Sequence, residues 1–160
     1  MAKSRPKLAI SSLDKTIDEL VRQTDHKVLA TWALDRAERV LHYFEDSYPR
    51  DDRPRRAIEA GRAWVKTGVF KMAVIRKDSL GSHAAARAVE DADPARSAAR
   101  AAGQAVATAH VSTHSIAAAR YAASAVRDAA HPTEDDAADA AVEKERQWQH
   151  RHLQGLRKAD

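Results

Sequence analysis

The sequence predicts an all-α protein, a single-domain helical bundle of six or seven helices with alanine-rich close packing. Three observations lead to this prediction. The 160-residue chain contains 35 alanines, which have the best helix propensity, and only 5 Gly and 5 Pro that would interrupt helices. Proline and capping residues recur at positions that suit helix starts and ends. No two segments show the alternating apolar pattern expected of paired strands.

Alanine also indicates how the helices pack. Ile, Leu, Val and Phe together number only 27 residues, so large apolar side chains cannot supply most of the core. Between Ala84 and Ala130 there are 21 alanines. Helices with such small faces can approach to roughly 8 Å, the close end of normal helix packing.

Four helices are expected in the first half of the domain, over 12–23, 26–47, 54–66 and 70–91. Ser12, Asp25 and Asp52 are the expected N-caps of the first three. The helix over 26–47 has one apolar face, and Arg36 falls on its polar side. Thr67-Gly68 ends the third helix, and a kink near 79–82 is expected in the fourth.

Three further helices are expected over 94–110, 113–130 and 133–156. Asp93 caps the first, Thr113 or the serine before it caps the second, and acidic residues in the first turn favour the third. The expected domain organisation is a flexible basic arm over 1–10, a helical domain over 11–156 and a frayed tail over 157–160.

Composition excludes several classes of protein. Without cysteine the chain has no disulfide scaffold, thiol nucleophile, thiolate zinc site or iron–sulfur site. No stretch reaches the roughly 18 apolar residues of a membrane span, and the basic start lacks a signal-type apolar core, so we expect a cytoplasmic protein with no membrane partner. The net charge is +4, but acids are interspersed among the bases, so nucleic acid is not an expected partner.

Catalytic motifs give little support to an enzyme. Ser12 to Lys15 matches S-x-x-K and Lys66-Thr67-Gly68 matches K-T-G, two of three elements of penicillin-recognising serine enzymes. The third element is missing, and K-T-G belongs on a strand that this chain does not predict. Phosphate-binding, zinc-protease, esterase and calcium motifs are also missing. We therefore expect a protein that is not an enzyme and needs no cofactor.

Histidines and arginines are the candidate binding residues. His83, His110 and His114 lie in alanine-dominated segments, where they form either a structural hydrogen-bond network or a binding site. Although His110 and His114 are four apart, Val111 to Thr113 interrupts the helix between them, so no metal site is expected. Arg53 and Arg55 lie in a cluster that either binds an anionic partner or pairs with nearby acids.

Several motifs resemble a known family when taken in order. They are Asp52-Arg53-Pro54-Arg55, Arg62-Ala63-Trp64, His83 to Arg87, Ala101-Ala102-Gly103, Ala107 to Val111, His114, Tyr121 and Glu145 to Gln149. With these motifs, residues 28–156 resemble the fifth class of bacterial immunity proteins of polymorphic toxin systems. The resemblance implies a small all-helical protein that neutralises a cognate toxin.

Two functions are therefore expected in order. The first is an immunity protein that binds its toxin stoichiometrically. The alternative is a self-resistance module that binds a small molecule or metabolite in an internal polar pocket. The candidate pocket or partner-patch residues are Trp32, Asp35, Arg53, Arg55, His83, His110, His114 and Trp148.

Overall fold

The computed structural model describes residues 8–130 and 135–160, and within them every regular element is a helix. Seven helices have nine or more residues, and a single-turn helix, α3, follows α2. This confirms the predicted all-α class. The bounds are α1 Asp14–Arg22, α2 His26–Val40, α3 His42–Glu45, α4 Arg53–Thr67, α5 Met72–Arg87, α6 Pro94–Ala107, α7 His114–Ala129 and α8 Asp135–Ala159.

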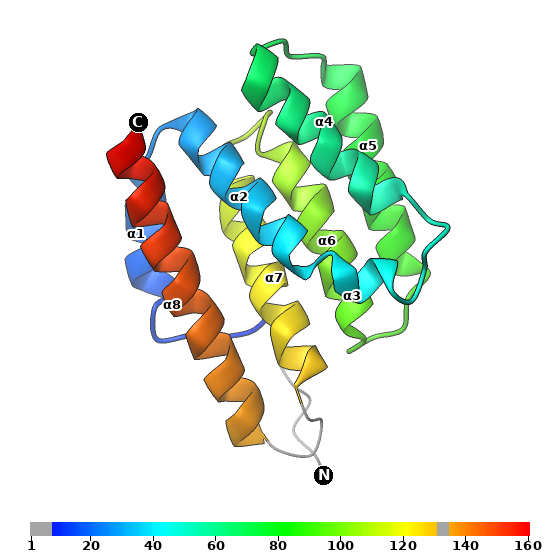
Figure 1. The fold of residues 1–160 in the computed structure, drawn as a ribbon, viewed down its shortest axis with the longest axis vertical. Helices are drawn as coiled ribbons and strands as arrows, with labels where there is room; N and C mark the ends of the chain where they lie inside the picture. The colour runs from blue at the N-terminus through cyan, green and yellow to red at the C-terminus, as the bar shows by residue number, and fades with distance from the viewer. Residues whose placement is uncertain (1–7, 131–134) are drawn as a thin grey trace.

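The helices form a bundle with α6 near its centre. Figure 1 shows α8 and α1 on one side, α4 and α5 on the other, and α2, α6 and α7 between them. Helix α6 packs against α2, α3, α4, α5 and α7. Its buried surface is made almost entirely of small side chains, as the alanine excess predicts: Ala95, Ser97, Ala98, Ala99, Ala101, Ala102, Gly103, Ala105 and Val106.

Larger side chains fill the remaining core in two places. Trp64, Ile58 and Phe44 belong to the main cluster around α6. A second cluster joins α1, α2, α7 and α8, and it contains Ile17, Val21, Val28, Leu29, Trp32, Ala119 and Leu153. Helix α2 is therefore packed on two sides, by the main cluster and by α8. Among the described residues, every helix is too short or too polar to cross a lipid bilayer.

Several predicted helix ends are confirmed. Asp25 caps α2 by accepting a hydrogen bond from the Lys27 N–H at 3.2 Å, and Asp93 caps α6 through the Ala95 N–H at 2.8 Å. Gly68 ends α4 in the left-handed conformation, with φ of 69°, which suits a residue without a Cβ.

Three predicted caps make no side-chain capping bond, although Asp52 and Thr113 do occupy the N-cap positions of α4 and α7. Ser12 instead donates its hydroxyl to Glu143 at 2.9 Å, which joins the start of the domain to α8. Asp51, not Asp52, accepts the N–H of Arg53 at 3.2 Å. Thr113 makes no capping bond to α7.

Helix lengths also differ from the prediction. Helix α2 ends at Val40, because the Leu41 N–H bonds to the Glu38 carbonyl three residues back rather than four. Helix α5 ends at Arg87, and α8 continues past Leu156 to Ala159. Of the expected arm over 1–10, residues 1–7 lie outside the described residues, and Ala9 is buried with its N–H donated to Ser124 Oγ at 2.9 Å. The predicted start of the last helix, at Thr133, also lies outside them.

Candidate functional site

The predicted arginine cluster is neutralised by neighbouring carboxylates. Arg53 Nη2 lies 2.6 Å from Asp51 Oδ2, and Arg55 Nη2 lies 2.6 Å from Glu45 Oε1. Arg55 also reaches Glu38 at 3.3 Å. The hydrogen bond to its carboxylate raises the pKa of each of these two arginines above its ordinary value. Both guanidinium groups are therefore oriented by contacts within the protein.

Trp32 and Asp35 lie on α2 where it meets α8. Trp32 is fully buried and donates its indole N–H to the Gln149 carbonyl at 2.9 Å. Asp35 accepts from His152 Nε2 at 2.7 Å and pairs with Arg62 Nη1 at 2.7 Å. These contacts connect α2 to α8 on one side and to α4 on the other. Both residues hold helices together in this arrangement.

Trp148 of α8 stacks with three cationic or aromatic side chains. Its ring lies almost parallel to that of His152, at 6° with a centroid separation of 5.2 Å. The guanidinium carbons of Arg36 and Arg39 lie 3.3 and 3.9 Å from the Trp148 ring centroid. A guanidinium over an indole face is a favourable cation–π contact.

Arg36 is the main site residue that the sequence analysis placed wrongly. It is fully buried rather than on the polar side of its helix, and no described group hydrogen-bonds any of its three guanidinium nitrogens. Burial lowers the pKa of Arg36 to about 9, although Glu145 and Asp35 oppose this shift. Its cation is therefore held by the Trp148 face and by two nearby carboxylates.

The Glu145 to Gln149 motif is largely structural. Glu145 accepts from Arg39 Nε at 3.1 Å, while Arg146 donates to Asp14 at 2.9 Å and to Gln149 Oε1 at 2.8 Å. Gln149 in turn donates to the Ala119 carbonyl at 3.0 Å. All three polar side chains are buried, and their hydrogen bonds link α8 to α1, α2 and α7, although the Nε of Arg146 has no hydrogen-bond partner among the described residues.

The three predicted histidines gather along α5, α6 and the start of α7. Arg100 Nη1 lies 3.0 Å from His83 Nδ1, which must accept because a guanidinium only donates. His114 Nδ1 lies 2.7 Å from Gln104 Oε1 and therefore donates. Burial, together with the charges of Arg100 and Arg87, lowers the pKa of His83 to about 4, and burial also lowers the pKa of His114.

Gly103 provides the space that His83 occupies. A Cβ at this position would lie 2.8 Å from His83 Nε2, closer than real Cβ atoms come to other atoms. His110 is exposed and stacks on Phe70 at a centroid distance of 6.1 Å. Across the ranges 8–130 and 135–160, no three His, Asp or Glu side chains are arranged to hold a metal ion. The contacts of His83 and His114 are those of a structural hydrogen-bond network.

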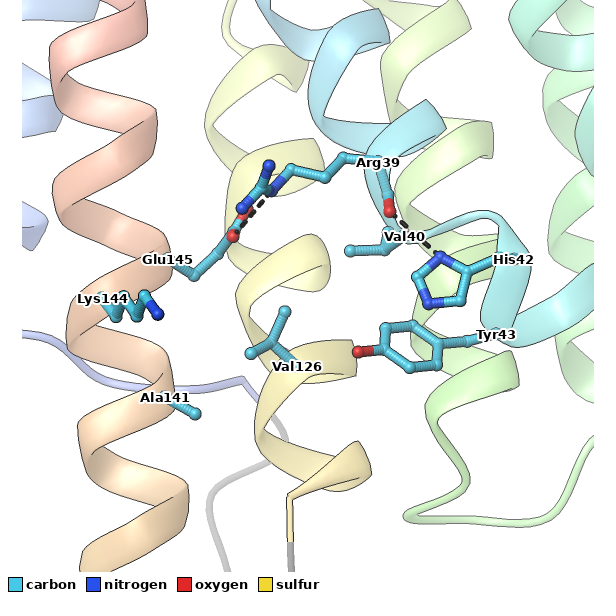
Figure 2. A pocket seen from close by; sticks show the side chains of 8 residues that line it. All are labelled: Arg39, Val40, His42, Tyr43, Val126, Ala141, Lys144 and Glu145. Carbon is cyan, nitrogen blue, oxygen red and sulfur yellow. Dashed lines mark hydrogen bonds and ion pairs between the residues drawn. The ribbon is translucent and has the colours of Figure 1, made fainter.

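A groove that the sequence analysis did not anticipate lies between α8, α7 and the α2–α3 junction (Figure 2). It has a volume of about 420 Å³. Val40, Val126 and Ala141 give it an apolar surface, and Figure 2 shows the Tyr43 hydroxyl directed toward Val126. Its polar lining residues are Arg39, His42, Lys144 and Glu145.

The predicted site residues do not form a single pocket. In Figure 1, α6 and α7 separate α5, which carries His83, from α8, which carries Trp148. Trp32, Asp35 and Trp148 come together at the α2–α8 junction, while the histidines form a separate group and Arg53 lies at the start of α4. The groove described above is lined by residues from the α2–α3 junction, α7 and α8. These segments are separated in sequence, so no local sequence signal identifies the groove.

Comparison with known proteins identifies a family. The Imm-5 like putative immunity protein family matches residues 19–156. No curated protein and no solved structure matches the chain. The matched region includes α2 to α7, most of α8, the histidine group and the buried network of α8. Because the match covers most of the chain, this protein belongs to the family of Imm-5 like putative immunity proteins.

Proposed function

We propose that the protein neutralises a cognate toxin by binding it stoichiometrically, without catalytic turnover. Membership of an immunity protein family over residues 19–156 is the observation that carries this proposal. The geometry of the titratable groups supports it. Asp35, His83 and His114 are each engaged by a neighbouring side chain, so their hydrogen-bonding capacity serves the fold rather than a reaction.

A titration of toxin activity tests the proposal directly. The toxin domain encoded beside the gene for this chain is assayed with increasing amounts of the purified protein. Stoichiometric binding predicts that activity falls linearly and reaches its minimum at one protein per toxin. Complete protection by a small fraction of the toxin's molar amount would indicate an enzyme and contradict the proposal.

The groove supports a second candidate function, the binding of a small molecule. Its volume of about 420 Å³ lies within the roughly 300–1,000 Å³ common for ligand sites. The Tyr43 hydroxyl and the Lys144 ammonium are polar groups beside an apolar surface, as such sites require. A Val126→Trp substitution should fill the groove. If this variant loses protection against a small toxic metabolite but still neutralises the protein toxin, the groove is a separate ligand site.

A further inference from the structure

Exposed apolar side chains are concentrated near the α4–α5 connection. Among the described residues, eight large apolar side chains are exposed, and six of them lie in or beside this connection, on α5 or in the α6–α7 loop: Val69, Phe70, Met72, Val74, Leu80 and Val111. The remaining two, Ile10 and Tyr48, lie elsewhere in the chain. Large apolar groups gathered on the surface of a soluble protein commonly mark a contact site.

Helix geometry places two of these apolar side chains, Met72 and Leu80, on one side of α5. Met72, Arg76, Leu80 and His83 follow one another at spacings of four, four and three residues, which align them along one flank of α5. His83 contacts Arg100, so this flank borders α6.

Two loops complete the same surface. Phe70 precedes α5, and its ring stacks on His110, the residue before Val111 in the α6–α7 loop. We call this surface the α5 face. Its apolar members are Phe70, Met72, Leu80 and Val111. Four cations belong to it or border it: Arg76 lies on the flank with Met72 and Leu80, Lys77 follows on the adjoining side of α5, and Lys66 and Lys71 lie at the two ends of the α4–α5 connection.

The cations of the α5 face differ from most arginines of the protein. Residues 66–80 contain these four cations and a single acid, Asp78. Within the part of the chain that the structure describes, none of the four has a carboxylate within ion-pair distance. By contrast, Arg39, Arg55 and Arg62 are all paired. The charge on this face is therefore available to a partner.

We propose that the α5 face is the contact surface for the cognate toxin, which meets it with an acidic surface surrounding an apolar centre. This inference rests on the proposed function. Interfaces between proteins commonly have an apolar centre with a polar rim, and complementary charge accelerates their association. Interfaces with nucleic acid are more polar and more positively charged throughout, so the exposed Phe70, Met72 and Leu80 favour a protein partner.

Charge reversal with a matched control tests the cationic part of the α5 face. The face variant combines Lys71→Glu with Lys77→Glu, and the control combines Lys15→Glu with Arg151→Glu. Each changes net charge by the same amount, with one exposed cation at the start of a helix and one inside a helix. Lys15 lies 4.0 Å from Glu19, but a pair between two such exposed side chains should contribute little to stability. A second face variant with glutamine at positions 71 and 77 avoids any effect of added negative charge on folding.

An apolar pair tests the centre of the face. Phe70→Ser removes a member of the α5 face, and Ile10→Ser removes an exposed apolar side chain that lies outside it. Circular dichroism and thermal melts establish that every variant is folded. Binding to the toxin domain encoded beside this gene is then measured by surface plasmon resonance at about 50 and 300 mM salt, which differ in charge screening.

The expected result separates the face from the controls. The charge-reversal face variant should raise Kd by at least ~10-fold, mainly through slower association, and should reduce the salt dependence, because exposed interface charges act mostly on association. The glutamine variant should show a smaller change of the same kind. Phe70→Ser should also weaken binding, mainly through faster dissociation, whereas both controls should bind like the wild type.

Other outcomes overturn the inference and can be told apart. If the wild type binds the toxin domain and the face variants bind as well as the controls, the contact surface lies elsewhere and the proposed function stands. If the wild type does not bind the toxin domain, the proposed function fails and the inference fails with it. A further outcome is that the wild type binds a DNA duplex or phosphatidylserine vesicles more tightly than the toxin domain. If the face variants lose that binding, the α5 face is assigned to nucleic acid or to a membrane.

Discussion

Replacing glycines by alanine should separate helix propensity from packing within this one protein. Gly61, Gly81 and Gly155 all lie inside helices. A Cβ at Gly61 would lie 2.5 Å from a terminal methyl carbon of Leu34 and 3.1 Å from the other, whereas a Cβ at Gly81 or Gly155 would meet no atom within 4 Å. Leu34 is fully buried between helices, so its side chain has little room to move away.

The expected magnitudes follow from two opposing effects. Alanine is favoured over glycine in a helix by about 1 kcal/mol, so Gly81→Ala and Gly155→Ala should each stabilise the protein by about 0.5–1 kcal/mol. At Gly61 the same gain is opposed by overpacking, which typically destabilises a core by about 1–3 kcal/mol. Gly61→Ala should therefore lower the free energy of unfolding by about 1–2 kcal/mol.

Urea unfolding followed by circular dichroism measures all three variants against the wild type. For a chain of this size each kcal/mol should also move Tm by about 2–4 °C, so the variants should melt on opposite sides of the wild type. If Gly61→Ala proved as stabilising as Gly81→Ala, Leu34 would be free to repack. The close approach of α4 to α2 would then not depend on a missing side chain.

Four further results are expected. Trp64→Ala should lower the free energy of unfolding by about 3–5 kcal/mol, measured by urea unfolding, because it empties a buried aromatic site. A loss well under about 1 kcal/mol would mean that the face of α4 that carries Trp64 is exposed to solvent. The pKa of His83 is lowered to about 4, so the folded protein resists protonation of this residue and its stability should fall as the pH falls from about 6.5 toward 4. Thermal melts of His83→Gln should show a smaller fall in stability over this range than melts of a His42→Gln control. Changing both Arg53 and Arg55 to alanine should lower the free energy of unfolding by about 1 kcal/mol or less for each half-exposed ion pair and should preserve toxin neutralisation. Loss of neutralisation at unchanged Tm would instead show that these arginines contact the toxin. A metal chelator should leave Tm unchanged, and a large fall on chelation would point to a metal held by the histidine group.

The fold was predictable because its signals are local. Alanine content, proline positions and the capping residues Asp25 and Asp93 act within one helix, and the structure confirms the elements that they predict. The missed cap at Ser12 fails for a tertiary reason. Ser12 has the right residue type for an N-cap, but Glu143 of α8 offers acceptors to both its backbone N–H and its hydroxyl. A contact between residues so distant in sequence has no local signal.

The candidate site was less predictable, because most of its residues have the expected type but a different role. Arg53 and Arg55 could bind a partner or pair internally, and the sequence left both open; the structure pairs them with Asp51 and Glu45. The sequence analysis did not predict a role for the cations of residues 66–77, although their segment contains a single acid, Asp78. Only the packed structure shows that no carboxylate from elsewhere in the described fold pairs with them.

Arg36 shows why a buried cation is hardest to predict. Its place three residues after Ala33 and four before Val40 puts it beside the buried stripe of α2, so its charge and not its spacing assigned it to the polar side. In the bundle α2 has two buried sides, because α8 covers the second. That second side combines apolar packing, in which Val28, Leu29 and Trp32 share a cluster with Leu153, with polar contacts. The polar contacts are the Trp148 face over Arg36, the Arg39–Glu145 pair and the His152–Asp35 bond. Hydrophobic periodicity can detect the apolar part, but a charged residue buried by polar contacts gives no apolar signal, so the burial of Arg36 must be found from the structure.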